Sequence, residues 1–194
     1  MHAESPVPDL PPFSFTVQTL ELGTDIRAFG LELIETESRE PLHGSAAAEI
    51  WAAAFLALSA TEPFLVDFFS HLDRVRDFCE AHNIAYREAA ARCLVVPQPS
   101  IQVLRMFLAR FETETFGLRA GPAAQNTDPT LEGELSHRGL DAYEAAYPRY
   151  TFCAICEPKD GWVTVLSGSL WPSEIIRRAR PALQPFDVYI ARPQ

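Results

Sequence analysis

Two cysteines three residues apart, Cys153 and Cys156, have the spacing that most resembles a chemical motif in this chain. A redox Cys-x-x-Cys pair lies at the N-terminus of a helix, where the helix dipole lowers the pKa of one thiol. Here the pair lies in TFCAIC, a β-branched and aromatic run that predicts a strand. Side chains three apart on a strand point to opposite faces, so we expect two ordinary strand residues.

A second set of possible metal ligands lies near the middle of the chain. Cys79 and His82 form a Cys-x-x-His pair at a predicted helix end, and Cys93 is near in sequence. Zinc takes four ligands of these types, but neither Cys pair has the Gly or Pro turn residues that normally tighten a zinc knuckle. We expect no metal site and no cofactor.

Histidines supply the candidates for acid-base chemistry. Asp67 and His71 are four residues apart in a segment that predicts a helix, so the carboxylate could orient the imidazole as a catalytic base. The alternative is a solvated pair beside Arg74. His137 lies in a predicted loop next to Arg138 and a glycine; loop histidines of this kind can be functional, and they are also common in plain turns.

Aromatic and basic side chains gather toward the C-terminus and are the candidates for binding. Aromatic residues with a polar group are favoured at interfaces and in pockets, as well as in mixed cores. The arginines form either a solvated helix face or a partner for the acidic N-terminal hairpin, within the fold or across a dimer. The candidates are Tyr143, Tyr147, Trp162, Trp171, Arg177, Arg178 and Arg180.

The elements that must position these residues follow from periodicity and breakers. Residues 1–12 hold four prolines and predict a flexible lead-in. The near-alternation of residues 13–34 predicts an antiparallel hairpin, and residues 150–193 predict a second hairpin, a helix and a last strand. Between them we expect helices over 45–60, 63–81, 101–116 and 140–147, a strand over 93–96, and a long loop over 119–139.

Composition limits the class of protein. The chain has 194 residues, 47% of them hydrophobic, and a net charge of −10, which argues against nucleic-acid binding through clustered cations. No secretory signal opens it, and its longest apolar run, Ile50–Leu58, is shorter than the roughly 20 residues of a membrane span. Because arginine greatly outnumbers lysine and alanine is abundant, we expect a GC-rich, bacterial coding sequence. Four cysteines do not form a dense disulfide scaffold in a chain of this length, so we expect a cytoplasmic protein.

These patterns predict an α+β fold in a single domain over residues 13–194. Its sheet should be mostly antiparallel, built from the N-terminal hairpin and the C-terminal strands, with the middle helices packed on one face. Since no catalytic constellation is recognisable, we expect a non-enzymatic binding protein, such as an adaptor, inhibitor or immunity-type factor. It would act through a protein partner or as a homodimer, using the 119–139 loop and the arginines. The alternative is a small enzyme with an aromatic pocket in which His137, beside Trp171, is the acid or base.

Overall fold

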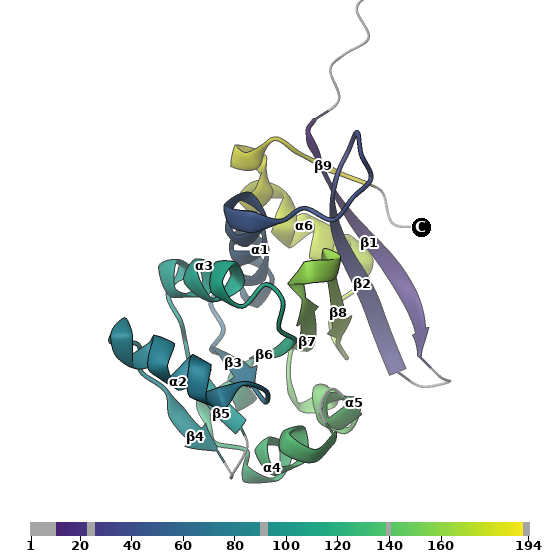
Figure 1. Cartoon of the computed structure of the whole chain (residues 1–194). Coiled ribbons are helices and arrows are strands. Elements are labelled where there is room, and N and C mark those ends of the chain that lie inside the picture. Colours follow the sequence, from purple (N-terminus) through teal and green to yellow (C-terminus); the bar gives the residue numbers. More distant parts are fainter. Residues whose placement is uncertain (1–10, 23–25, 90–92, 139–140, 192–194) are drawn as a thin grey trace, which may run out of the picture.

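The strands of the described chain form one open sheet in the order β4-β5-β3-β6-β7-β8-β2-β1-β9 (Figure 1). The computed structural model describes residues 11–22, 26–89, 93–138 and 141–191, so the expected lead-in lies outside the described residues except for Pro11 and Pro12. The strands are β1 (Phe13–Leu22), β2 (Ile26–Glu35), β3 (Phe64–Phe68), β4 (Arg87–Ala89), β5 (Cys93–Pro97), β6 (Phe116–Ala120), β7 (Phe152–Glu157), β8 (Trp162–Leu166) and β9 (Val188–Ile190).

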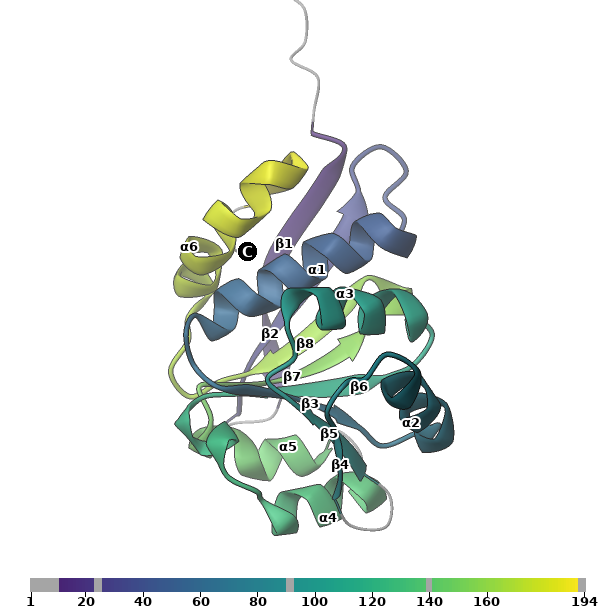
Figure 2. The same cartoon turned by 90° about the vertical axis from the view of Figure 1, so that its left-hand side faces the viewer.

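Helices cover both faces of this sheet. The α-helices are α1 (Gly44–Ser59), α2 (Leu72–Ala81), α3 (Ile101–Arg110), α4 (Pro129–Arg138), α5 (Asp141–Ala146) and α6 (Pro172–Leu183). Short 3-10 turns are η2 (Pro122–Gln125), η3 (Tyr147–Arg149), η4 (Pro158–Asp160) and η5 (Gln184–Phe186). Figure 2 shows α1, α3 and α6 on one side of the sheet and α4 and α5 on the other. We call these sides the first face and the second face.

The two ends of the chain meet in the middle of the sheet. β2 pairs antiparallel with β8, with Leu31 opposite Val163, and this pairing joins the N-terminal hairpin to the C-terminal strands. Every neighbouring pair of strands is antiparallel except β1 and β9. The α+β fold with a mostly antiparallel sheet is therefore confirmed.

The main core lies between the first face and the helices α1, α2, α3 and α6. Alternate residues of β1, such as Phe15 and Val17, point into it, which explains the near-alternation of the sequence. α1 is buried along most of its surface, and its Trp51 ring stacks on Phe55 with 5.5 Å between centroids. No helix in the described part of the chain is long and apolar enough to cross a membrane.

The prediction of one helix over residues 63–81 is wrong. Residues Phe64–Phe68 form β3, which lies between β5 and β6 with all five residues buried, and the helix α2 begins only at Leu72. A strand buried on both faces has a continuous apolar run without period-two alternation, so its sequence can imitate helical spacing. His71 separates the two elements in a left-handed conformation, with φ of 50°.

The prediction of a long loop over residues 119–139 is also wrong. The segment contains the end of β6, the turn η2 and the helix α4. Pro129 opens α4, Asp128 accepts a hydrogen bond from the N–H of Leu131, and Leu131 and Leu135 are buried one helical turn apart. Likewise, the helix expected to reach residue 116 ends at Arg110, and Phe116 begins β6.

Candidate functional site

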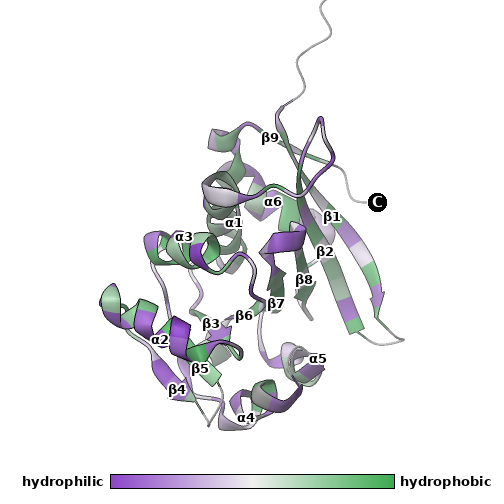
Figure 3. Ribbon diagram, viewed as in Figure 1, coloured by the Kyte–Doolittle hydropathy of each residue, from purple (hydrophilic) through white to green (hydrophobic). Residues whose placement is uncertain are grey.

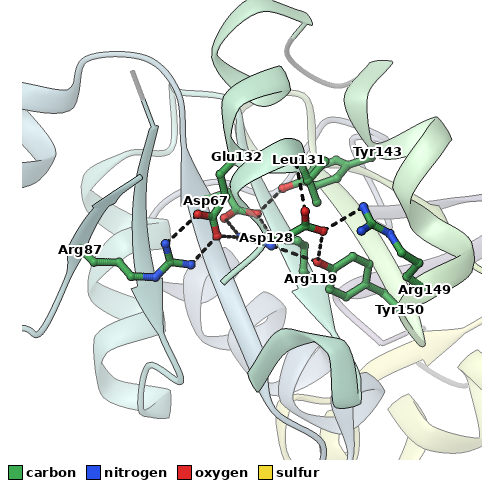
Figure 4. A network of polar contacts seen from close by, with 9 residues as sticks. All are labelled: Asp67, Arg87, Arg119, Asp128, Leu131, Glu132, Tyr143, Arg149 and Tyr150. Carbon is green, nitrogen blue, oxygen red and sulfur yellow. Dashed lines mark hydrogen bonds and ion pairs between the residues drawn. The ribbon is translucent and has the colours of Figure 1, made fainter. Parts of the chain in front are cut away.

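A buried network of charged groups lies between the second face of the sheet and the helices α4 and α5 (Figure 4). At its centre Arg119 of β6 makes a two-pronged contact with Asp67 of β3. Nε lies 2.7 Å from Oδ2, and Nη2 lies 2.7 Å from Oδ1. Both side chains have 0% exposure. The pairing of β3 with β6 holds the two residues together, because Leu65 is opposite Arg119 and Asp67 is opposite Gly117.

The helices contribute the next members of the network. Glu132 of α4 accepts a hydrogen bond from Nη2 of Arg119 at 3.0 Å and a two-pronged contact from Arg87 of β4. The hydroxyl of Tyr143 in α5 donates to Oδ2 of Asp67 at 2.6 Å. Each helix is thus tied to the sheet by a charge-assisted hydrogen bond, which is stronger than a bond between neutral groups.

Tyr150 extends the network toward the surface. Its hydroxyl accepts a hydrogen bond from Nη1 of Arg119 at 3.1 Å and donates to Oδ2 of Asp128 at 3.2 Å. Arg149 lies 2.8 Å from the same Asp128 oxygen. The three arginines of the network, at positions 87, 119 and 149, balance the three carboxylates at 67, 128 and 132. The cluster is therefore electrically neutral.

These contacts shift the pKa values of Arg119 and Glu132 in the directions that keep both groups ionised. Burial opposes the Arg119 cation, but the charge and hydrogen bonds of Asp67 outweigh burial and raise its pKa. Burial likewise opposes the Glu132 anion, but hydrogen bonds from Arg87 and Arg119 hold its pKa below the usual range. Burial and the Asp67 charge raise the pKa of Tyr143, so its hydroxyl stays protonated and donates.

The centre of this network has a structural role. Asp67, Arg119 and Tyr143 are fully buried, and Asp67 contacts the other two, so none of them reaches the surface. Burial also raises the pKa of the nearby Cys93 thiol to about 12, which removes its nucleophilic character at neutral pH. The network fixes the position of α4 and α5 on the sheet.

The expected pair of Asp67 and His71 does not form. Asp67 points to the second face from β3, whereas His71 is exposed before α2 and its Nε2 lies 3.2 Å from Oε2 of Glu114. The two residues are four apart in a strand and a turn instead of one helix. The helical geometry on which the acid-base hypothesis depended is absent.

The four cysteines are buried free thiols. A smaller hydrophobic core, which includes Leu131 and Leu135, lies on the second face, and we call it the second-face core. Cys153 belongs to this core and Cys156 to the main core on the first face, which confirms that the two point to opposite faces of β7. Cys79 and Cys93 are separated in the same way. Over the described residues, no group of three or more His, Cys, Asp and Glu side chains is arranged to hold a metal ion.

The aromatic candidates do not form one neighbourhood. Tyr143 is part of the network, and Tyr147 lies in η3 beside the second-face core. Trp162 lies on β8, whereas Trp171 is 57% exposed before α6, with the Arg27 guanidinium 3.9 Å from its ring centroid.

Two of the three arginine candidates on α6 have partners in their own helix or near it. Arg177 and Arg178 both bind Glu174, and Arg178 also donates to the backbone carbonyl of Leu58 at 2.7 Å. Arg180 lies one turn further along the helix, at a surface depression that it shares with Tyr189. The alternative that these arginines contact the acidic hairpin within one chain finds no support among the contacts of the described residues, where Glu174 is the carboxylate that binds Arg177 and Arg178.

Trp171 and Arg178 line an open depression of about 700 Å³ at the N-terminal end of α6. Its other walls include Glu62, Thr151 and Ser173. His137 is exposed at the last turn of α4 and does not line this depression. The enzyme alternative requires His137 to lie beside Trp171, and the structure does not bring the two residues together.

The second face is covered only in part. Figures 1 and 2 show α4 and α5 packed below one half of the sheet, with β1 and β2 extending away from them. In Figure 3 hydrophilic and hydrophobic bands alternate along β1. Six residues on the uncovered part belong to neither hydrophobic core, and we call them the open face: Thr16, Gln18, Gly30, Glu32, Trp162 and Thr164.

Trp162 lies flat across the open face because Gly30 has no side chain. A Cβ atom at position 30 would lie 2.2 Å from the Trp162 ring. The indole N–H donates to Oγ1 of Thr164 at 3.0 Å, and beside it Oγ1 of Thr16 donates to Oε2 of Glu32 at 3.1 Å. The result is a fixed, partly exposed aromatic ring with polar groups around it.

Comparisons with protein-family models, with curated proteins and with solved structures give no match.

Proposed function

We propose that this protein is a non-enzymatic binding protein that acts through a protein partner, and that the open face is the contact surface. The observation that supports this most is the Trp162 ring, held flat on Gly30 in the part of the second face that α4 and α5 leave uncovered. Tryptophans in a fixed orientation contribute much of the affinity at protein interfaces, and a polar border completes such surfaces.

The titratable groups also favour binding over catalysis. The buried charges, including the candidate Asp67, are paired with one another, and the two histidine candidates for an acid or base, His71 and His137, lie apart on the surface. The net charge of −10 and the carboxylate of Glu32 on the open face favour a neutral or basic partner. We place the interface on the open face instead of at residues 119–139, because those residues include α4, which is tied into the buried network through Glu132.

The experiment is a quantitative pull-down from the source cells followed by measurement of the dissociation constant with the partner recovered. Trp162→Ala removes the ring, and Gly30→Ala displaces it, so each should weaken binding by about thirtyfold or more, the range of an interface hot spot. Trp171→Ala is the matched control, because Trp171 is exposed on another surface. Its affinity should equal that of the wild type.

A further variant separates the open face from the basic surface of α6. Changing Arg177, Arg178 and Arg180 together to Glu should leave binding intact. Loss of binding in this variant, with normal binding by Trp162→Ala, would assign the interface to α6 instead. Failure of the wild type to recover any stoichiometric partner would contradict the proposed function itself.

A further inference from the structure

The outer edge of β1 is paired along only part of its length. β9 pairs with β1 in parallel over Phe13–Phe15, and the N–H of Ala191 donates to the carbonyl of Phe15 at 3.0 Å. β1 continues to Leu22, however, and on its other side it pairs with β2 over all ten residues. Within the part of the chain that the structure describes, residues 16–22 have no strand partner on the outer side.

The hydrogen bonds determine which backbone groups face outward. The Phe15 carbonyl points to β9, and backbone direction alternates along a strand, so Val17, Thr19 and Glu21 also direct N–H and C=O outward. The hydrogen bonds of β2 lead to the same assignment of outward-facing residues in β1. Leu33 directs its N–H to Gly161 beside β8, so the even-numbered residues of β2 face β1, where Gly30 is opposite Gln18.

This edge lacks the usual protection against pairing. Natural edge strands are shielded by prolines, charges, bulges or short length. Residues 16–22 contain no proline, and Glu21 is their single charged residue. The regular register of β1 with β2 also excludes a bulge in this stretch. The edge can therefore accept another strand.

We propose that a second copy of this chain pairs with the open edge, so that two β1 strands run antiparallel about a two-fold axis at Thr19. In this register Thr19 is opposite Thr19 of the partner subunit, and Val17 is opposite Glu21 of the partner subunit. All three outward-facing residues of each chain then lie in hydrogen-bonded pairs, in which the two opposite residues exchange two backbone hydrogen bonds. A shift by two residues in either direction leaves one residue of each chain unpaired.

The side chains fit the same register. Glu21 meets a valine instead of a second glutamate, so no like charges lie directly opposite, and a Thr–Thr pair is favourable across strands. The partner strand pairs as far as Val17, just beyond the end of β9, whose last residue Ile190 is opposite Phe15. The two-fold axis is normal to the sheet, so the two open faces lie on the same side. The dimer does not depend on the proposed function of that face.

Sedimentation velocity tests the dimer over loading concentrations from about 1 to about 100 µM, the range in which a modest interface assembles. The wild type should sediment as a dimer at the upper end. Thr19→Pro removes one outward N–H without removing a hydrogen bond to β2, since proline is accepted at strand edges that face solvent. It should weaken dimerisation at least tenfold with unchanged circular dichroism, whereas Thr19→Val should behave as the wild type.

A covalent trap gives a second, independent readout. Thr19→Cys should form an intermolecular disulfide on mild oxidation, because the two Cα atoms would lie about 5.5 Å apart across the axis. Ser38→Cys, at an exposed turn, is the control and should stay monomeric. A wild type that is monomeric at the highest concentration overturns the proposal. So does a folded Thr19→Pro variant that dimerises normally, or equal oxidation of the two cysteine variants.

Discussion

Arg119 is the residue on which the buried network depends. Its guanidinium contacts Asp67, Glu132 and Tyr150, and replacing it with Met would leave two carboxylates without their common cation. Removing one partner of a buried ion pair costs about 3–5 kcal/mol, and we expect Arg119→Met to lower the free energy of unfolding by that amount. Urea denaturation measures it. Arg177→Met breaks an exposed pair and should leave the urea midpoint unchanged; equal effects of the two changes would contradict the structural role of the network.

Glu132 predicts how stability depends on pH. Its pKa is lowered in the folded state, so the ionised form stabilises the fold at pH values above the unfolded pKa. That contribution should be complete above about pH 5 and disappear as the pH falls through the folded pKa. The unfolding free energies of the wild type and Glu132→Gln should therefore differ at pH 7 and converge as the pH falls through the lowered pKa of Glu132. Values that stay equally far apart at every pH would disprove this linkage.

The residue-level predictions succeeded where only local geometry mattered. The opposite directions of Cys153 and Cys156 follow from strand periodicity alone. Asp67 was a candidate, but its partner is Arg119, fifty-two positions away, and only the pairing of β3 with β6 brings the two together. A signal existed in the sequence, because FLVDF and FGLRA are apolar runs that each contain one charge, and the charges are opposite. Such lone charges can be satisfied by each other when both strands are buried.

At the level of elements, α5 docks on the sheet through a glycine. A Cβ atom at position 117 would lie 2.0 Å from the hydroxyl oxygen of Tyr143, so Gly117→Ala should push α5 away from β6. We expect a loss of about 1–3 kcal/mol in unfolding free energy, typical of overpacking, and faster hydrogen exchange in α5. Gly168→Ala is the control, since no atom lies within 4 Å of the added group. Normal exchange in α5 of the Gly117→Ala variant would argue against this docking.

The elements that the sequence failed to predict share a physical cause. β3 is covered on both faces, so its sequence lacks the alternation of apolar and polar residues by which strands are recognised. α4 has a narrow apolar stripe, Leu131 and Leu135, in an otherwise polar segment, and its proline at the first position was the available signal. Periodicity also does not indicate which face of a sheet a helix will cover. The helices α1, α2 and α3 share one face as expected, whereas α4 and α5 lie on the other.

For the whole molecule, the uneven cover of the sheet is the feature on which the proposed function depends. One face carries a continuous core, and the other is divided between the ion-paired helices and the open face. In the proposed dimer the two open faces would form one surface with two Trp162 rings. A partner with two matching sites would then gain affinity through simultaneous contacts.

The pairing of β2 with β8 also has a consequence for synthesis of the chain. Leu31 cannot pair with Val163 until Val163 has been synthesised, and at typical elongation rates Val163 leaves the ribosome of the order of ten seconds after Leu31. During that interval both sides of the N-terminal hairpin lack their neighbouring strands. We expect the nascent chain to be vulnerable to aggregation until its last fifth has emerged, and a chaperone that shields strand edges would matter most in that period.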